Sequence, residues 1–470
     1  MKLISTRNLK QQFLRFDFGL RLQMLTFVVV TLLYVVVTPP FQVRDEPNHF
    51  FKAYYLSEGG ILSLRINDSL GADLPTSVGD MVNQRFPAEG ALPGHKYRLL
   101  DIVSAWSQSD DFDRRQFTPF SYIASYSPTL YAPQAFGISI ARGFGVSTLG
   151  QFYAGRLFNA GVGIMLVIGA IVLMPFGRGV MMAFAAFPMV SYQIGSLSAD
   201  AMIIGLSFFT LAYTLRLATC ATLPRWAVLW PGLLSLLALA KGVYLPIALA
   251  GFAIKPWRTW YVVALLLSLM IAFVVALEWL KYNSGNFIRQ SFIGRYSLIH
   301  MQSALPSEQI SYVVNHPFLF FKILTESFVS RMPVYAVDAI GRFGWFTVML
   351  PIPIYVIAVI SATLAVASPS VLKVRILGWT RLFWGTIVLG ICLLIEAALY
   401  LTATQFGANY VEGVQGRYFI PLLPLLGIAL LCPLNGSKAV GRLVQKCLTP
   451  TVLTLMFGGL ITNLMSYWLI

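Results

Sequence analysis

The chain has 470 residues, of which 57% are hydrophobic and only 11% charged, and its mean hydropathy is +0.71. A soluble domain usually carries about 25% charged residues. This composition therefore excludes an ordinary soluble protein and indicates several membrane spans of roughly 20 apolar residues each.

Taken in chain order, the sequence predicts an all-α polytopic membrane protein with about eleven transmembrane helices and long outer loops. A cytoplasmic segment at 1–21 precedes the first span at 22–38, which lacks a cleavage site and is expected to be retained. A first outer loop covers 39–150, spans two to seven lie in 151–280, a second long outer loop covers 281–344, and the last spans lie in 345–470. The predicted spans begin near Leu22, Gln151, Val180, Asp200, Trp226, Gly242, Trp260, Trp345, Leu382, Tyr418 and Val452. The pair on either side of Lys241 is either two spans or a re-entrant hairpin.

The basic residues are strongly one-sided. One set of span ends carries sixteen of the 34 basic residues but only one of the 19 acidic residues, Asp17. Basic residues in short loops mark the cytoplasm, so the N-terminus is expected to be cytoplasmic and the long polar loops to face outward. Topology thus accounts for the net charge of +15 without a nucleic-acid partner, and these ends would also lie near anionic membrane lipids. The basic set is Lys2, Arg7, Lys10, Arg15, Arg21, Arg178, Arg216, Arg225, Lys255, Arg258, Lys373, Arg375, Arg381, Lys438, Arg442 and Lys446.

The cysteines give no sign of a disulfide framework. All four lie in predicted spans or at their cytoplasmic ends, and none lies in a long polar loop. They are Cys220, Cys392, Cys432 and Cys447.

The first outer loop opens with the sequence RDEPNHF, from Arg44 to Phe50. Neighbouring prolines supply turn residues, but a turn does not need two adjacent carboxylates at the edge of the hydrocarbon. A helix that starts with Asp45 as its N-cap and Glu46 in its first turn would explain the pattern structurally. A pair of catalytic carboxylates would explain it functionally, and the two interpretations are compatible.

Ionisable side chains at membrane depth are costly and usually face a bundle interior or a water-filled cavity. Most of those in this chain lie close to predicted outer ends of spans. They are Arg156, Asp200, Lys241, Glu278, Glu396 and Arg417.

Three of them have a chemical interpretation beside a structural one. Asp200 lies in SLSADA, where either it or Ser198 would cap a helix. Lys241 lies in LALAKGVYLP, where the alternative to ligand binding is snorkelling to the interface. Arg417 lies in GVQGRYFIPLLPLL, whose glycines permit close backbone approach. A guanidinium there suits a pair of phosphate oxygens, whereas the alternative is an interfacial anchor beside Tyr418.

Groups able to take a proton and groups able to hold a phosphate thus share one membrane depth at the predicted outer face. This combination fits an enzyme that acts on a lipid-phosphate donor, although a shared depth does not establish that the side chains meet. The set is Asp45, Glu46, His49, Asp200, Lys241 and Arg417.

Two loop segments, Tyr126 to Val146 and the residues after Leu305, are aromatic, proline-punctuated and amphipathic. This predicts helices that lie in the outer membrane interface. The sequence contains no Walker loop, HExxH, dinucleotide fingerprint or CxxC pair, so ATP hydrolysis, zinc proteolysis and redox chemistry have no support.

The pair Asp45-Glu46 followed by His49-Phe50 resembles the acidic first-loop motif of GT-C membrane glycosyltransferases. It is closest to the DE-x-H-F form of protein O-mannosyltransferases, although a proline and an asparagine here separate Glu46 from His49. An ordered set of motifs over residues 39–430 also looks like a large bacterial family of uncharacterised membrane proteins placed near GT-C enzymes. The motifs are PPFQVRDEPNHFFKAYYLSEGG, YSPTLYAPQAFGISIARGFG, AGRLFNA, SLSADA, LAKGVYLP, FGW and GVQGRYFIPLLPLL.

The resemblance implies a GT-C-like bundle in the bacterial inner membrane with an active site that faces outward. It implies inverting transfer of one sugar from a polyprenyl-phosphate donor, such as an undecaprenyl phosphate, to a hydroxyl of a cell-envelope glycan, lipid or protein. By position it makes Asp45 the base, assisted by Glu46, which would hold the acceptor, a metal ion or the local hydrogen-bond network. Arg417 and Lys241 are assigned to the donor phosphate on chemistry and depth.

Supporting roles around this centre are expected for His49, Asp200, Arg156, Gln415 and Tyr418. Some GT-C enzymes use a divalent cation, Mg or Mn, whereas others do not. Glu46 and His49 are possible metal ligands, but a structural hydrogen bond is the favoured role for His49.

Two other classes of protein share these features. A transporter or flippase for a lipid-linked saccharide would also need spans and buried charges, but it does not explain an outer loop that opens on a carboxylate pair, and no internal hydropathy repeat is visible. A polysaccharide polymerase or ligase would also use a lipid-phosphate donor. The number of sugars moved per donor separates it from a glycosyltransferase.

Overall fold

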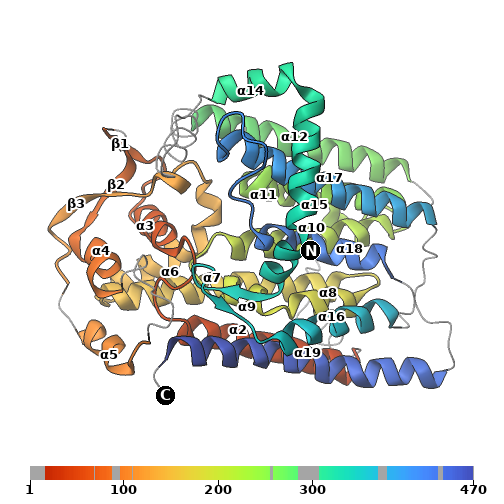
Figure 1. The fold of residues 1–470 in the computed structure, drawn as a ribbon, viewed down its shortest axis with the longest axis horizontal. Coiled ribbons are helices and arrows are strands. Elements are labelled where there is room, and N and C mark those ends of the chain that lie inside the picture. The colour runs from red at the N-terminus through yellow and green to blue at the C-terminus, as the bar shows by residue number, and fades with distance from the viewer. Residues whose placement is uncertain are drawn as a thin grey trace.

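The computed structural model describes residues 16–67, 69–86, 96–107, 110–254, 258–283, 306–368, 378–431 and 438–468. Over these ranges the chain is mostly helical, with one three-stranded and one two-stranded sheet, which confirms the expected all-α class. The long helices run side by side along the longest axis of the molecule (Figure 1). They are α2 (Phe18–Val37), α7 (Thr148–Leu173), α10 (Asp200–Ala218), α12 (Thr259–Tyr282), α17 (Gly378–Thr402) and α19 (Lys438–Tyr467).

Seven helical segments among the described residues are long and apolar enough to cross a membrane. They are the six long helices (α19 from Leu443 onward) and Arg225–Ala253, compared with about eleven spans expected from the sequence. The other predicted spans are short or interrupted, and prolines at the starts of α9, α16 and α18 and inside η6 contribute to this. The shorter elements are α8 (Arg178–Ala185), α9 (Pro188–Ile194), α16 (Ile352–Ala367), η6 (Gly416–Leu422) and α18 (Leu423–Ala429).

The segment Arg225–Ala253 comprises η4 (Arg225–Leu229), α11 (Trp230–Lys241) and η5 (Gly242–Ala253). It forms a helical hairpin, with α11 and η5 as its two arms.

The hairpin bends at Lys241, whose own backbone is extended, with φ −163° and ψ 98°. Trp230 and Phe252, from its two far ends, both pack against Tyr261, with ring centroids 5.2 and 6.0 Å away. The two arms therefore lie side by side, and Lys241 occupies the turn.

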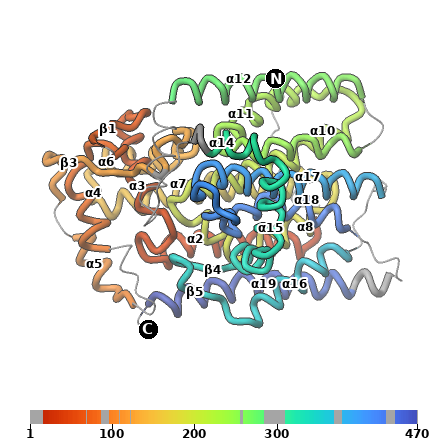
Figure 2. Tube along the Cα trace, turned by 45° about the horizontal axis from the view of Figure 1, so that its top comes forward, coloured from red at the N-terminus to blue at the C-terminus, as the bar shows by residue number. Residues whose placement is uncertain are grey.

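The segment predicted as the first outer loop, 39–150, folds into a cap at one end of the long helices (Figures 1 and 2). Its antiparallel sheet has the strand order β1-β2-β3, and short helices surround it. The strands are β1 (Leu64–Ile66), β2 (Ser69–Pro75) and β3 (Arg115–Pro119). The helices are α3 (Glu46–Ser57), α4 (Thr76–Asp80), η1 (Met81–Arg85), α5 (Leu99–Ser107), η2 (Ser121–Ile123), η3 (Pro128–Leu130) and α6 (Ala132–Gly143).

Helix α6, which the sequence predicts as an interfacial helix, packs against α7. A Cβ atom on Gly137 would come 2.6 Å from the Ala154 carbonyl oxygen. The rings of Phe136 and Phe158 meet edge to face at 5.4 Å. The glycine therefore permits a close helical pair at the start of α7.

The second long loop contains α14 (Pro306–Asn315) and α15 (Pro317–Gly341), followed by a hairpin of β4 (Arg342–Phe343) and β5 (Val348–Met349). Helix α15 runs across the direction of the long helices and leads to the hairpin (Figures 1 and 2). The free thiols are those of Cys220, Cys392 and Cys447, whereas Cys432 lies outside the described residues.

Candidate active site

Asp45 directly precedes α3 but does not cap it. Its backbone is left-handed, with φ 66° and ψ −2°, and its side chain makes no capping hydrogen bond to the helix. Phe41 is also left-handed, with φ 63°. Non-glycine residues in this conformation cost on the order of 1–3 kcal/mol each. The strained turn thus aims the Asp45 carboxylate away from its own helix.

Arg417 connects two carboxylates from different parts of the chain. Its Nη2 donates to Asp45 Oδ2 at 2.6 Å, and its Nε lies 3.3 Å from Asp200 Oδ2. The Arg417 side chain is only 6% exposed, whereas that of Asp45 is 35% exposed. Arg417 is therefore a buried, paired cation rather than an interfacial anchor, and Asp45 is the carboxylate that stays accessible.

Ser198, not Asp200, supplies a side-chain acceptor at the start of α10, although the N-cap position itself is Ala199. The backbone N–H of Asp200 donates to Ser198 Oγ at 3.1 Å. Because the serine satisfies the helix terminus, the Asp200 carboxylate faces Arg417 instead.

The charges around Asp45 control its ionisation. Burial favours the neutral acid, but the positive charges of Arg417 and Arg44 and the hydrogen bond from Arg417 outweigh it and hold the pKa of Asp45 below its ordinary value. Asp45 is therefore ionised at neutral pH, as a proton acceptor must be.

Lys241 reaches the same centre from the bend of the hairpin. Its Nζ lies 3.9 Å from the centroid of the Tyr418 ring, a cation–π contact. Tyr244 donates to the Tyr418 carbonyl oxygen at 2.7 Å and so ties η5 to η6. Lys241 thus faces the protein and makes a defined contact there.

His49 lies behind Asp45 and is almost fully buried, at 5% exposed. Its Nδ1 and the Tyr131 hydroxyl share a hydrogen bond of 2.8 Å. Burial lowers the pKa of His49 to about 4, although the charges of Asp45 and Asp200 oppose the shift. His49 is thus neutral near pH 7 and holds a structural hydrogen bond, the role that the sequence favoured.

Glu46, next to Asp45, has the opposite environment. It is 0% exposed, and each of its carboxylate oxygens accepts two hydrogen bonds. The donors are Arg156 to both oxygens, the Leu197 N–H to Oε1 and the Phe41 N–H to Oε2. No capacity remains for an acceptor or a metal ion, so the expected catalytic role of Glu46 is corrected to a structural one.

Arg156 completes this buried pair. Beyond its bonds to Glu46, it donates to the carbonyl oxygens of Val35, Thr38 and Pro39 at 3.0, 2.6 and 3.1 Å. All five guanidinium N–H groups are thereby used. The pair locks the end of α2 to the start of α3 and so fixes the turn that carries Asp45.

A metal site is not evident from the residues that could have formed one. Neither Glu46 nor the Nδ1 of His49 is available as a ligand, because both have protein partners. Within the described ranges, no three His, Cys, Asp or Glu side chains are grouped so as to hold a metal ion. Glu46 is therefore not available to a divalent cation.

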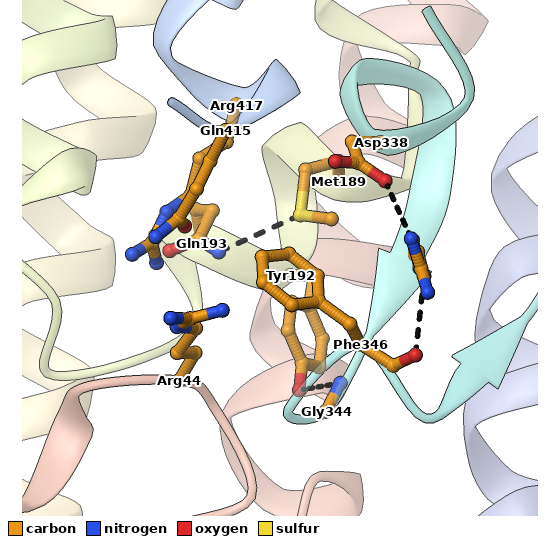
Figure 3. Close-up of a pocket in the computed structure, with 10 residues that line it drawn as sticks. Arg44, Met189, Tyr192, Gln193, Asp338, Gly344, Phe346, Gln415 and Arg417 are labelled. Carbon is orange, nitrogen blue, oxygen red and sulfur yellow. Dashed lines mark hydrogen bonds and ion pairs between the residues drawn. The ribbon is translucent and has the colours of Figure 1, made fainter. Parts of the chain in front are cut away.

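The glycines that flank Arg417 are required by the backbone. Gly413 has φ +77°, and a Cβ atom on Gly416 would come 2.1 Å from the Tyr335 carbonyl oxygen of α15. Gln415, which is 7% exposed, lines a small cavity with Arg417 and Arg44 (Figure 3).

Two of the six ionisable residues predicted at membrane depth lie elsewhere. Glu278 is exposed on α12, and Glu396 is buried in α17, where it accepts a hydrogen bond of 3.1 Å from Tyr335. The structure therefore brings Asp45, Asp200, Lys241 and Arg417 together, with Glu46 and Arg156 immediately behind them.

The family model described as "Predicted membrane protein (DUF2142)" matches residues 27–426. The chain belongs to this DUF2142 family. No curated protein matches it.

Two solved structures of ArnT from Cupriavidus metallidurans resemble the DUF2142 chain over 95% of its length. The structure in the apo state has 12% identity and a TM-score of 0.41 over 75% of that chain. The structure bound to undecaprenyl phosphate has 13% identity and a TM-score of 0.44 over 76% of that chain. Similarity at this level carries no information about the reaction of the DUF2142 chain.

Two tyrosines of the DUF2142 chain belong to the site but were not predicted as site residues. Tyr131 bonds His49, and burial and the charges of Tyr418, Asp200 and Asp45 raise the pKa of Tyr126. The signal was present in YSPTLY, where a Ser-Pro turn separates two tyrosines just before α6. It was interpreted as the start of an interfacial helix.

Proposed function

We propose that this DUF2142 protein is a GT-C-type glycosyltransferase. It would move a single sugar from a polyprenyl-phosphate donor to a hydroxyl of a cell-envelope glycan, lipid or protein, with inversion at the anomeric carbon. The observation that carries the proposal is the contact between Asp45 and Arg417. It joins an accessible, ionised carboxylate to a buried guanidinium, the two groups that such a transfer requires.

Asp45 is the proposed base. The acceptor hydroxyl attacks the anomeric carbon and loses its proton to the Asp45 carboxylate as the new C–O bond forms. Asp45 suits this role better than Asp200, since its side chain is 35% exposed against 14% for Asp200. Direct attack from the face opposite the phosphate gives inversion.

Arg417 is the proposed partner of the leaving group. As the bond between the anomeric carbon and the phosphate oxygen breaks, the oxygen takes the bonding electron pair and becomes more negative. A guanidinium already held in place stabilises that charge without reorganising. Lys241 remains the alternative phosphate contact, while Gln415 and Tyr418 line the approach to Arg417.

The remaining predicted residues support this arrangement. The Glu46–Arg156 pair and the His49–Tyr131 hydrogen bond hold the Asp45 turn from behind. Placing base and cation in advance accounts for much of the rate in reactions of this type.

The proposed location is a bacterial inner membrane, with a cytoplasmic N-terminus and the site at the outer face. The one-sided distribution of basic residues supports this orientation. The cap formed within residues 39–150 would then cover the site from outside.

The test of the proposed function is transfer by purified, monodisperse protein with a polyprenyl-phosphate sugar as donor. Arg417→Lys should lose part of the rate, because a lysine ammonium is a point charge and cannot bind two phosphate oxygens as a guanidinium does. Arg417→Ala should lose roughly 30- to 1000-fold, equivalent to about 2–4 kcal/mol. Arg114→Ala, an exposed arginine of the first loop, is the control.

Normal turnover by Arg417→Ala would remove Arg417 from the mechanism. The product also separates the competing functions. A glycosyltransferase adds one sugar residue per donor, a polymerase or ligase adds a preassembled oligosaccharide, and a flippase forms no new bond.

A further inference from the structure

The three nitrogens of the Arg417 guanidinium differ in their partners. Nη2 donates to Asp45, and Nε lies 3.3 Å from Asp200 Oδ2 without forming a hydrogen bond. Nη1 is buried and has neither an ion-pair nor a hydrogen-bond partner in the described part of the chain. A buried donor without a partner is costly. Nη1 of Arg417 therefore has a free donor for an acceptor group that the described residues do not supply.

Arg417 borders a small cavity. Arg417 and Arg44 point into the same gap, and the Gln193 amide lies beside them (Figure 3). Arg44 Nε is also buried without a hydrogen-bond partner among the described residues, and its ion pair with Asp45 is long, at 3.9 Å. Two guanidinium groups with unused donors thus meet at one place.

The residues that line the cavity are mostly cationic, while Asp45 and Asp200 pair with Arg417 from outside this lining. Three arginines line it, Arg44, Arg342 and Arg417, against a single lining carboxylate, Asp338, which lies 3.6 Å from Arg342. Lys241 does not line this cavity, because it lies against the Tyr418 ring. Arg44, unlike Lys241, therefore lines this cavity together with Arg417.

Phe346, at the tip of the β4–β5 hairpin, is one of the residues that line the cavity. The Arg44 and Arg342 guanidinium carbons lie 4.3 and 5.2 Å from the centroid of its ring. The Phe346 backbone is left-handed, with φ 66°, which costs on the order of 1–3 kcal/mol for a non-glycine residue. The present volume of about 10 Å³ admits about one water molecule, so a larger anion must displace the ring.

The hairpin itself is attached to the same turn as Asp45. The Trp345 indole N–H donates to the Phe41 carbonyl oxygen at 3.3 Å, and the Gly344 N–H donates to the Tyr192 hydroxyl at 3.0 Å. Displacement of Phe346 would therefore move a hairpin that is hydrogen-bonded to the turn that carries Asp45.

We infer that the cavity beneath the β4–β5 hairpin is an oxyanion site that binds the phosphate of the lipid donor between Arg44 and Arg417 when Phe346 moves aside. This inference rests on the proposed function. It assigns Arg44 to the donor phosphate in place of Lys241, and it assigns Phe346 as the residue that closes the site.

The test measures binding, not turnover, with the full-length purified protein. Farnesyl phosphate is the probe, and farnesol and inorganic phosphate separate the contributions of the tail and of a free anion. Arg44→Gln should weaken farnesyl phosphate binding roughly 10- to 100-fold, as expected for a lost charge-assisted hydrogen bond. Lys241→Gln should change it by less than about threefold.

Phe346→Gly should strengthen the binding of farnesyl phosphate, since it removes the ring and glycine adopts the left-handed backbone without strain. If Arg44→Gln does not fold, Arg44→Lys keeps the charge but not the fork and should bind with intermediate affinity.

Three results would overturn the inference. Loss of binding in Lys241→Gln with unchanged binding in Arg44→Gln would place the phosphate on the lysine side and leave the proposed function intact. Equal binding of farnesol and farnesyl phosphate would show that the tail alone is recognised. Equal affinity for inorganic phosphate and farnesyl phosphate would indicate a site for free phosphate.

Discussion

Arg417 and Asp45 lie 372 positions apart in the chain, yet Arg417 Nη2 donates to Asp45 Oδ2 at 2.6 Å. The contact joins the turn after the first long helix to the short element η6. Asp200, at the start of α10, approaches the same guanidinium. The centre is thus assembled from three elements and exists only in the folded bundle.

Asp45→Asn should abolish sugar transfer while leaving the protein folded and able to bind donor. Asparagine tolerates the left-handed backbone at this position but cannot accept a proton, and the loss of a general base costs roughly 10²- to 10⁴-fold. The measurement is transfer per monodisperse molecule. Asp113→Asn, an exposed acid of the same loop, should behave as wild type. Turnover above about a tenth of wild type in Asp45→Asn would remove Asp45 as base.

Glu46→Gln should act on stability more than on chemistry. It leaves Arg156 buried without its counter-charge, which costs on the order of 3–5 kcal/mol, so the yield and the thermal unfolding midpoint in detergent should fall. Glu58→Gln, at the other end of α3, removes a partly exposed ion pair with Arg115 and should cost less than about 1 kcal/mol. A Glu46→Gln protein as stable as wild type but without activity would return Glu46 to the catalytic centre.

His49 should make the protein less stable in mild acid. Its pKa is about 4 in the folded protein and about 6.5 when unfolded, so the unfolded state binds the extra proton as pH falls through 6.5. Stability should therefore decrease from pH 7 to pH 5 by at most about 2 kcal/mol from this residue. The measurement is the unfolding midpoint against pH. His49→Gln should flatten that dependence, and an unchanged slope would show that His49 is not responsible.

The predicted orientation can be tested with single cysteines in a protein whose native cysteines are replaced. A cysteine in place of the exposed Asp111 should react with an impermeant thiol reagent in intact cells, because the basic residues place that loop outside. A cysteine at the exposed Thr219, at the opposite end of α10 from Asp200, should react only after lysis. The reverse pattern would overturn both the orientation and an outward-facing active site.

The sequence predicted the depth of the site residues but not their contacts. Hydropathy and charge placed Asp45, Asp200 and Arg417 at one end of several helices, since both properties vary along the membrane normal. Nothing in one sequence states which helices are neighbours, so the meeting of these three side chains could not be derived. The hairpin at Lys241 was left open for the same reason.

The different environments of Asp45 and Glu46 could not be predicted from the sequence either. The two carboxylates are adjacent, and their roles depend on one left-handed backbone angle at Asp45 and on the distant Arg156. Helix α15 was missed as a long element because its sequence mixes charged residues with apolar ones, a pattern that suggested a surface loop with interfacial helices.

The most direct test of the account is a structure of the protein with a non-hydrolysable polyprenyl-phosphate sugar bound in a lipid nanodisc. The account predicts a phosphate oxygen at about 3 Å from the Arg417 guanidinium, with the open face of the anomeric carbon directed toward the Asp45 carboxylate. A donor phosphate bound away from Arg417, with no path from the anomeric carbon to Asp45, would contradict it.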